Sequence, residues 1–283
     1  MKVIFTIIIL IICIITIKLI IEYNIDTFDN NEIKTNTKAN LKILFDDLEY
    51  YKKFNKSIKI NSLINNNKLF ECYEKKNKIL FVTFDNRENQ EYVKIHNSNI
   101  TKYVEKFGYE YKFYTLCDKN VYWCKIHLVL EALESNQYDY VVWLDSDTVI
   151  KNFNIDIGDI LNMFSSDIFV GSDNHLKYGI INAGVFAIAN TETGTKFLSE
   201  CINSLNTDCI NADKTLKGKW AGTCYEQGVM NLLIHDKYYP YTTILTNHVI
   251  FNYNKCSDDV FIMHLYGSTP ESRIKCFQSK KDE

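Results

Sequence analysis

The sequence has little of what marks several protein classes. Its 283 residues include only 2 prolines and 10 glycines, which excludes a collagen-like or linker-rich chain. A formal net charge of −3, with no basic stripe, disfavours nucleic acid as a partner. No P-loop or glycine-rich phosphate motif is present. The hydrophobic content of 46% is ample for a packed core, so the chain is globular.

The cysteines include no C-x-x-C pair, which excludes a zinc ribbon. The nine cysteines stand at positions 13, 72, 117, 124, 201, 209, 224, 256 and 276. Cys13 lies in the first hydrophobic segment, and the other eight would suit disulfides in an oxidising compartment. Cys201 with Cys209 and Cys256 with Cys276 are candidate pairs, while free buried thiols remain an equal interpretation.

The amino-terminal segment predicts a membrane anchor over residues 1–22. Val3 to Ile21 is almost purely aliphatic, and as a helix it would span about 28 Å, enough for a bilayer core. A cleaved signal peptide is the alternative, but no small-residue cleavage site follows. Lys2 before the span and acidic residues after it favour a single-pass type II protein with a lumenal body, in the Golgi or endoplasmic reticulum.

Residues 23–76 are rich in asparagine, lysine and aspartate and show no sustained strand pattern. Apolar residues recur at helical spacing at positions 41, 44, 45, 48 and 51. We therefore expect a stem that carries one amphipathic helix, whose apolar stripe docks on the domain.

From Lys78 onward strands and helices alternate, which predicts a single α/β domain over 77–283 with a mixed, mainly parallel sheet. Gly108 is expected to end the first helix as its C-cap. We expect strands at 79–84, 109–116, 140–144, 167–171 and 258–265, and a turn into a strand at 182–188. We expect helices at 88–107, 123–133, 157–164, 193–205 and 225–235.

The strand at 140–144 ends in Asp145-Ser146-Asp147, the sequence's only D-x-D. Carboxylates at the carboxyl end of a strand lie where open α/β sheets bind ligands. Two of them can hold a divalent cation and, through it, a diphosphate. The alternative is a polar turn after a strand. The D-x-D therefore predicts a metal-dependent enzyme acting on a nucleotide-linked substrate, if other residues support it.

Six short motifs in order resemble the GT-A (nucleotide-diphospho-sugar transferase) fold, and within it glycosyltransferase family 34, the galactosyl- and xylosyltransferases of fungal and plant Golgi. The motifs cover about residues 78–268 and are Val82-Thr83-Phe84-Asp85, Trp123-Cys124-Lys125, Trp143-Leu144-Asp145-Ser146-Asp147, Asn182-Ala183-Gly184-Val185-Phe186, Glu226-Gln227-Gly228 and His264-Leu265-Tyr266-Gly267. Ala183 replaces the family's usual Thr, and Ser268 its usual Cys. No Lys follows where the family contacts the diphosphate, so Arg273 or Lys275 would serve.

The resemblance implies a metal site made by Asp145, Asp147 and His264. Asp147 and His264 would be direct ligands, and Asp145 would reach the metal through water or contact the ribose and sugar hydroxyls. An imidazole beside carboxylates suits Mn²⁺ better than Mg²⁺, which remains the alternative. A lone histidine on an apolar strand is more often a satisfied core residue. The place of His264 at a strand end, before a glycine, favours the ligand.

The first strand's end and the next helix are predicted to bind the nucleotide. Thr83 and Asp85 would receive the base and ribose, with strand-end capping as the alternative. Lys125 would meet a phosphate or pair with a carboxylate at the sheet edge, with a solvated helix residue as the alternative. Ser146 lies between the two aspartates and is assigned to the same site.

The remaining motifs are predicted to hold the sugar and the acceptor. Asn182 and Gly184 would line that site, although a plain β-turn is the competing interpretation. Glu226 and Gln227 open a helix, where Glu also satisfies the helix dipole. The catalytic residues implied are Asp145, Asn182 and Gln227, and Gly267 and Arg273 complete the substrate-binding set.

The function implied is the transfer of a hexose or pentose from a nucleotide sugar, with UDP-galactose, UDP-xylose or UDP-glucose as donor. The acceptor would be a glycan or glycoprotein, and anomeric configuration would be retained. A catalytically silent domain that binds a glycan or partner is the alternative, and a nucleotidyltransferase or phosphohydrolase is a third class without motif support. Asn55 and Asn99 stand in N-glycosylation sequons, usable only in a lumenal domain.

Overall fold

The computed structural model describes residues 77–279, except 165, 174–180, 214, 246–250 and 259. The predicted anchor (1–22) and stem (23–76) lie outside the described residues, as does Asn55. Among the residues that are described, no helix is long and apolar enough to cross a membrane.

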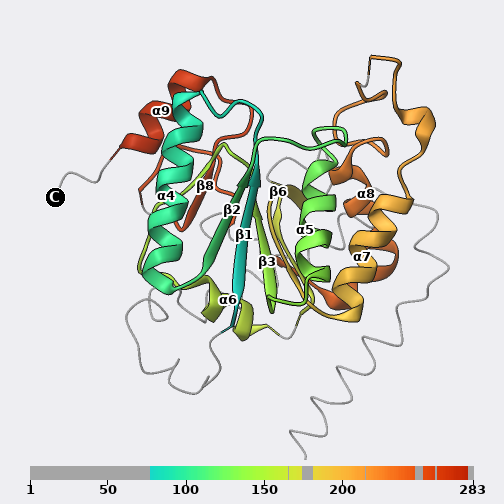
Figure 1. The fold of residues 1–283 in the computed structure, drawn as a ribbon, viewed down its shortest axis with the longest axis horizontal. Coiled ribbons are helices and arrows are strands. Elements are labelled where there is room, and N and C mark those ends of the chain that lie inside the picture. The colour runs from blue at the N-terminus through green and yellow to red at the C-terminus, as the bar shows by residue number, and fades with distance from the viewer. Residues whose placement is uncertain are drawn as a thin grey trace, which may run out of the picture. The chain divides into compact units, whose positions relative to one another are not determined.

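A six-stranded sheet forms the centre of the domain (Figure 1). Its strand order is β2-β1-β3-β6-β5-β7. The strands are β1 (Ile79–Phe84), β2 (Glu110–Tyr114), β3 (Tyr140–Leu144), β5 (Ile168–Ser172), β6 (Ile181–Ala189) and β7 (Thr242–Leu245). β6 is antiparallel to both of its neighbours, and the other three pairings are parallel. The predicted mixed, mostly parallel sheet is confirmed.

The reversed direction of β6 matters for the site. Because β6 is antiparallel to β3, its first residues lie beside the carboxyl end of β3, with Leu144 opposite Val185. The backbone N–H of Asp145 donates to the Gly184 carbonyl at 2.8 Å. The turn expected at the start of 182–188 is wrong, because Asn182 to Gly184 already belong to β6 and Asn182 lies opposite Gly171 of β5.

Helices flank the sheet on both sides. They are α4 (Glu91–Phe107), α5 (Cys124–Glu134), α6 (Ile157–Met163), α7 (Glu192–Asn203), α8 (Glu226–Leu233) and α9 (Pro270–Gln278). In Figure 1, α4 and α9 lie together to the left of the sheet, and α5, α7 and α8 lie to its right. α4 ends as expected at Gly108, whose left-handed φ of 70° favours glycine.

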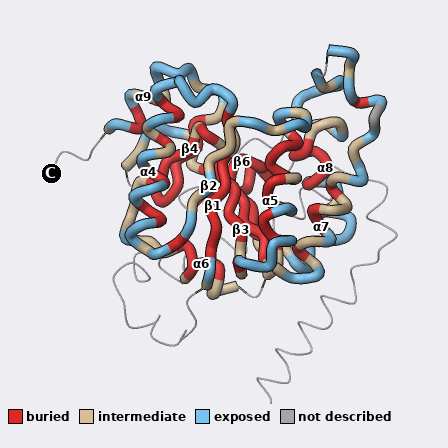
Figure 2. Tube along the Cα trace, viewed as in Figure 1, coloured by how far each residue is buried: buried red, intermediate tan, exposed pale blue. Residues whose placement is uncertain are grey.

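The core lies along the strands, which Figure 2 shows as the most continuously buried part of the described chain. All nine residues of β6 are buried, because helices cover both faces of the sheet. On one face Phe81 and Val142 pack with Tyr103 of α4 and Leu161 of α6. The long apolar run of β6 therefore reflects a central strand.

A second, two-stranded ribbon stands beside the sheet. It pairs β4 (Thr148–Ile150) with β8 (Ile262–His264) in antiparallel register, with Thr148 opposite His264. The strand expected at 258–265 is thus shorter, and β4, β7 and α9 were not expected from the sequence. The ribbon brings a residue near the end of the chain next to the D-x-D.

Three disulfides join described residues, namely Cys117–Cys124, Cys209–Cys224 and Cys256–Cys276. The predicted pairing of Cys256 with Cys276 is confirmed. The predicted pairing of Cys201 with Cys209 is wrong, because Cys209 bonds Cys224 and Cys201 is a buried free thiol.

The sequon at Asn99 is unsuited to glycosylation in the folded domain. The Asn99 side chain donates to the Ile150 carbonyl at 2.9 Å and accepts from the Ile150 N–H at 2.8 Å. A glycan on the amide nitrogen would break this pair of bonds. The structure therefore corrects the sequence-based interpretation of Asn99 as an acceptor.

His96 is a fully buried histidine that joins α4 to β1 and β4. Its two ring nitrogens lie 3.0 Å from Thr83 Oγ1 and 2.7 Å from the Thr148 carbonyl. Burial disfavours the imidazolium and lowers the pKa of His96 to about 4.

We expect this histidine to make stability depend on pH. Because its folded pKa lies below its unfolded pKa, the unfolded chain takes up the proton first, and stability falls as pH drops from 6.5 towards 4. The wild type should lose about 3 kcal/mol over this window relative to His96→Gln. Urea unfolding at a series of pH values measures the difference, and parallel stability curves for the two proteins would contradict it.

Candidate functional site

A pocket of about 730 Å³ lies where the carboxyl ends of β1 and β3 meet the start of β6. Most of the residues predicted for the site line it. They are Asp85, Lys125, Asp145, Ser146, Asp147, Asn182, Gly184, Glu226, Gln227, His264, Gly267 and Arg273. Thr83 does not line it. Residues spread over 189 positions of sequence therefore share one cavity.

Asp147 is held by two basic side chains. His264 Nε2 lies 3.1 Å from one carboxylate oxygen, and the Arg273 guanidinium lies 2.8 Å from the other. Burial by itself would raise the pKa of Asp147, but attraction from His264 and Arg273 outweighs it and holds the pKa below its ordinary value. Asp147 is therefore a carboxylate, the form that binds a cation.

The orientation of His264 is fixed from behind. Asn252 donates through Nδ2 to the Ser172 carbonyl at 2.9 Å, so its Oδ1 faces His264 Nδ1 at 2.7 Å. An amide oxygen can only accept, so Nδ1 carries the hydrogen. In a neutral ring Nε2 then presents its lone pair towards Asp147. This is the arrangement that metal-binding histidines commonly show.

Gly184 makes room for the imidazole. A Cβ added at this position would lie 2.0 Å from His264 Cε1 and 2.7 Å from both ring nitrogens. Any side chain at position 184 would therefore displace the ring. The glycine of the Asn-Ala-Gly motif is required here by close packing against His264.

The three predicted ligands fit a divalent cation. One ligand atom each from Asp145, Asp147 and His264 lies within 4.8 Å of the others. Neighbouring ligands of an octahedral ion with bonds of about 2.1 Å lie about 3 Å apart. The 3.1 Å between His264 Nε2 and Asp147 Oδ1 matches that spacing. The donor set of two carboxylates and one imidazole is suitable for such an ion.

Asp145 is oriented by a different pair of side chains. It accepts from Trp143 Nε1 at 2.7 Å, and the Lys125 ammonium lies 3.0 Å from the same oxygen. Lys125 also lies 3.0 Å from Glu226 Oε1 and donates to the Ala183 carbonyl at 3.2 Å. The prediction that Lys125 pairs with a carboxylate at the sheet edge is confirmed.

Lys125 and Glu226 form a buried ion pair beside the pocket. Burial alone would lower the pKa of Lys125, but the two carboxylates outweigh it and raise the pKa. Burial raises the pKa of Glu226, and the ammonium only partly offsets this. The second oxygen of Glu226 has no hydrogen-bond partner among the described residues. The Lys125 ammonium thus pairs with two pocket carboxylates, those of Asp145 and Glu226.

Asp85 and Thr83 have different surroundings. Asp85 takes two hydrogen bonds from the Arg87 guanidinium, at 2.9 and 2.8 Å, and one from the Ser146 hydroxyl. Burial by itself would raise the pKa of Asp85, but these hydrogen bonds outweigh it and keep the pKa below its ordinary value. Thr83 has no exposed surface and bonds His96, so its described contacts lie in the interior.

Two arginines contact one tyrosine at the α4 side of the pocket. The guanidinium carbons of Arg87 and Arg273 lie 5.9 and 5.0 Å from the Tyr92 ring centroid. Both arginines line the pocket, whereas Lys275 is exposed and does not. Of the two residues offered for the diphosphate, Arg273 is the one at the site.

The remaining predicted residues lie on the α8 side. Asn182 bonds the Gly184 N–H at 2.8 Å, and Gln227 Oε1 accepts from the Ala183 N–H at 3.1 Å. The NH₂ group of Gln227 is the other polar group of this side chain and can donate hydrogen bonds. Gly267 adopts a φ of 71°, which a glycine accommodates readily.

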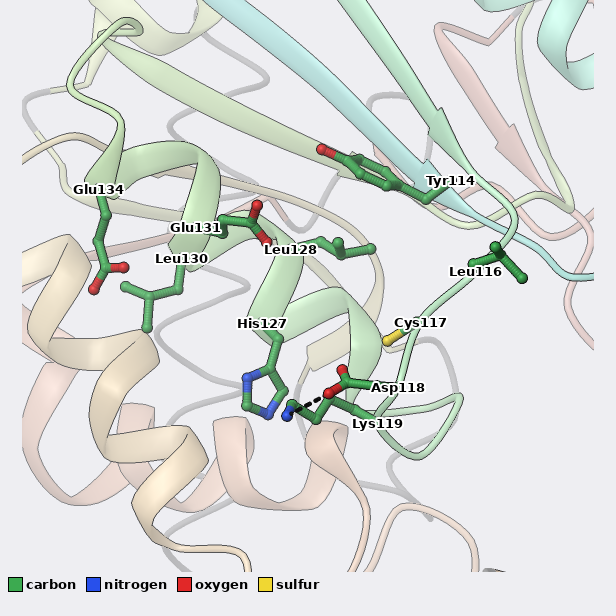
Figure 3. A pocket seen from close by; sticks show the side chains of 10 residues that line it. All are labelled: Tyr114, Leu116, Cys117, Asp118, Lys119, His127, Leu128, Leu130, Glu131 and Glu134. Atoms are coloured by element: carbon green, nitrogen blue, oxygen red, sulfur yellow. Dashed lines mark hydrogen bonds and ion pairs between the residues drawn. The ribbon is translucent and has the colours of Figure 1, made fainter.

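A second cavity, of about 740 Å³, lies along α5 (Figure 3). His127, Leu130, Glu131 and Glu134 of α5 line it, and Lys119, which is paired with Asp118, lies beside His127. None of the predicted site residues lines this cavity. The candidate site is therefore the pocket at the sheet edge.

The sequence profile of the family described as Nucleotide-diphospho-sugar transferase matches residues 74–273. The chain belongs to this family. The matched range covers every residue of the predicted site. The family supports a transferase that takes a nucleotide sugar as donor and a glycan as acceptor, in agreement with the aspartates and histidine described above.

One solved structure supports the fold. A glycosyltransferase involved in the glycosylation of the major capsid of PBCV-1 aligns with a TM-score of 0.54 at 14% identity, over 71% of this chain and 98% of that one. The glycosyltransferase GlyE of Streptococcus pneumoniae TIGR4 aligns with a TM-score of 0.44 at 12% identity, over 72% of this chain and 62% of that one. A search of curated proteins found no match.

Three parts of this site have weak sequence signals. Asn252 stands in a segment without a periodic pattern, so no sequence signal indicates its contact with His264. Arg87 follows Asp85 by two residues, a spacing that allows a local ion pair in a turn but does not require one. Tyr92 reads only as an apolar position of α4.

The contact between Gly184 and His264 is open to a direct test. We expect Gly184→Ala to weaken Mn²⁺ binding at least about tenfold, because the added methyl would displace His264, a predicted ligand. Overpacking should also cost about 1–3 kcal/mol of stability. Titration calorimetry with Mn²⁺ measures the affinity.

Gly194→Ala is the matched control. Its added Cβ would lie 2.3 Å from the Ala189 carbonyl oxygen, at the opposite end of β6, so it overpacks the domain away from the site. The control should lose stability and keep its Mn²⁺ affinity. Equal affinities in both variants would show that the close contact at Gly184 does not position the ligand.

Proposed function

We propose that this chain transfers a hexose or pentose from a UDP-sugar to a glycan or glycoprotein, with Mn²⁺ and with retention of anomeric configuration. UDP-galactose, UDP-xylose and UDP-glucose are the candidate donors, as the resemblance to glycosyltransferase family 34 implies. The observation that carries the proposal is the cluster of Asp145, Asp147 and His264 in the pocket of a nucleotide-diphospho-sugar transferase domain.

Departure of the diphosphate requires that negative charge building on its oxygens be neutralised. A bound divalent cation supplies a Lewis acid for this purpose. Asp147 and His264 would hold it, and Asn252 behind His264 would keep Nε2 pointed inward. Asp145, positioned by Trp143 and Lys125, would contact the metal through water or bind ribose and sugar hydroxyls.

Two guanidiniums would add to this neutralisation. Arg273 and Arg87 now pair with Asp147 and Asp85, and both lie over Tyr92. Arginine binds phosphate oxygens through paired N–H donors, so the family's lysine role is assigned to Arg273. The ion pair with Asp147 keeps the Arg273 guanidinium at the pocket wall, where the diphosphate of the donor would lie.

Retention requires stabilisation of the sugar's reacting face while the leaving group departs. We assign this to Gln227, whose position is fixed by the Ala183 N–H. Asn182 and Glu226 also line the pocket. Glu226 is kept in place by Lys125, which also holds Asp145, so the donor and sugar sides of the pocket share one ammonium group.

We further propose that the domain is lumenal and anchored through residues 1–22 as a type II protein of the Golgi or endoplasmic reticulum. The three disulfides among the described residues support an oxidising compartment. Protease protection of the domain in sealed microsomes would test the orientation. Digestion without detergent would contradict it.

A donor screen tests the proposed activity. The full chain, incubated with each UDP-sugar, Mn²⁺ and a glycan mixture, should release UDP and give a glycosylated product by mass spectrometry. Asp147→Asn and His264→Gln should each lower the rate at least about 100-fold, because they remove a metal ligand while keeping side-chain volume.

Lys275→Gln is the control for loss of charge near the site, and it should keep the wild-type rate because Lys275 is exposed outside the pocket. Removal of metal with EDTA should abolish transfer, and Mn²⁺ should restore it. Full activity in EDTA would overturn the metal-dependent mechanism. Release of nucleoside monophosphate in place of UDP would overturn the reaction class.

A further inference from the structure

Three aromatic rings meet at the pocket and are not used by the proposed chemistry. Trp220 lies 5.2 Å from Tyr122 and 5.1 Å from Tyr225, and the two tyrosines lie 5.1 Å apart, measured between ring centroids. Trp220 and Tyr122 line the pocket, and Trp220 is 47% exposed. We call Tyr122, Trp220 and Tyr225 the aromatic platform.

The platform is held by covalent and backbone constraints. The disulfide Cys117–Cys124 closes the loop that carries Tyr122, and Cys209–Cys224 closes the loop that carries Trp220. The indole N–H of Trp123 donates to the Cys224 carbonyl at 3.1 Å, which ties the two loops together. An exposed tryptophan packed against two tyrosines on braced loops offers a preorganised apolar surface to a ligand.

The loop also sits tightly against α8. A Cβ added at Gly228 would lie 2.1 and 2.4 Å from the carbonyl oxygens of Gly222 and Ala221. Only a residue without a side chain lets this backbone reach the start of α8. The approach of Ala221 and Gly222 to Gly228 holds the loop of Trp220 near Glu226 and Gln227, which also line the pocket.

The order of groups in a nucleotide sugar assigns the two sides of the pocket. In such a donor the diphosphate separates the nucleoside from the sugar. With the diphosphate at Asp147 and Arg273, a nucleoside on the Asp85 and Arg87 side leaves the sugar on the α8 side. Figure 1 shows α4 and α9 on the left and α8 on the right. The platform therefore belongs to the sugar side.

We propose that the aromatic platform binds a pyranose ring of the acceptor saccharide, stacked on Trp220. A pyranose has one face of C–H groups, which suits an aromatic ring, and a rim of hydroxyls, which suits polar neighbours. Glu226 and Gln227 supply those neighbours in the same pocket. The donor sugar would contact these two residues, and the acceptor ring would then occupy the exposed platform. The proposal rests on the transferase function above.

Tryptophan fluorescence tests binding without any need for activity. The chain has three tryptophans, and Trp123 and Trp143 are buried, so acrylamide reaches Trp220 alone. Methyl glycosides of glucose, galactose, mannose and xylose are added to the full chain, with and without UDP and Mn²⁺. At least one of them should protect Trp220 from quenching, and Trp220→Phe should remove the quenchable signal.

Kinetics then separates the acceptor from the donor. Trp220→Ala should raise the KM for the acceptor about tenfold. The KM for the donor and the rate of donor hydrolysis by water should stay at wild-type values. Trp220→Phe should restore most of the acceptor affinity. Leu232→Ala, which removes an equally exposed apolar side chain of α8 outside the pocket, should change none of these values.

Each other outcome overturns the proposal. Protection of Trp220 by UDP with Mn²⁺ alone would assign the platform to the nucleobase, and a raised donor KM in Trp220→Ala would assign it to the donor sugar. Absence of protection by all four glycosides in both states would exclude a sugar site. If the wild type releases no UDP from any donor, the transferase function fails, while protection by glycosides still reports on the platform.

Discussion

The neutralisation of two carboxylates at the end of β3 is the constraint on which the rest of the site depends. Asp145 and Asp147 lie in a pocket where an uncompensated negative charge is costly. Lys125 of α5 compensates the first, and Arg273 of α9 compensates the second, which also contacts His264 of β8. Elements far apart in the sequence therefore converge on one turn.

The two aspartates also divide the pocket into two sides. Asp147 faces the β4–β8 ribbon and α9, where basic groups suit a diphosphate. Asp145 faces α5 and the start of α8, where Lys125 joins it to Glu226. The arginines lie on the first side, whereas the second side holds the Lys125 ion pairs and the three rings of the aromatic platform. A substrate with a charged centre and a sugar end matches this distribution.

Much of the fold follows from local sequence. β1 and β3 have the predicted bounds, because each is an apolar run that stops at an aspartate. His264 was found from its place at the end of a strand before a glycine, and Lys125 from the Trp123-Cys124-Lys125 motif of the family resemblance. These signals are local, because strand ends and helix starts have characteristic residues.

The rest depends on tertiary contacts that local sequence does not carry. The direction of β6 is set by its neighbours, and it turns an expected loop at Asn182 into strand. Thr83 stands at a strand end, yet its side chain bonds buried His96. The role of Asn252 exists only because the ribbon brings His264 against it. Each of these depends on which strands become neighbours in the fold, or on which face of a strand turns inward.

Direct ligation of the metal by His264 is the central claim. Electron spin echo envelope modulation on the Mn²⁺-loaded protein with UDP measures it most directly, because it reports magnetic nuclei in the ligands of the metal. The account predicts ¹⁴N coupling from one bound imidazole together with ³¹P coupling from the diphosphate, and loss of the ¹⁴N coupling in His264→Gln. ³¹P coupling without ¹⁴N coupling in the wild type would contradict it.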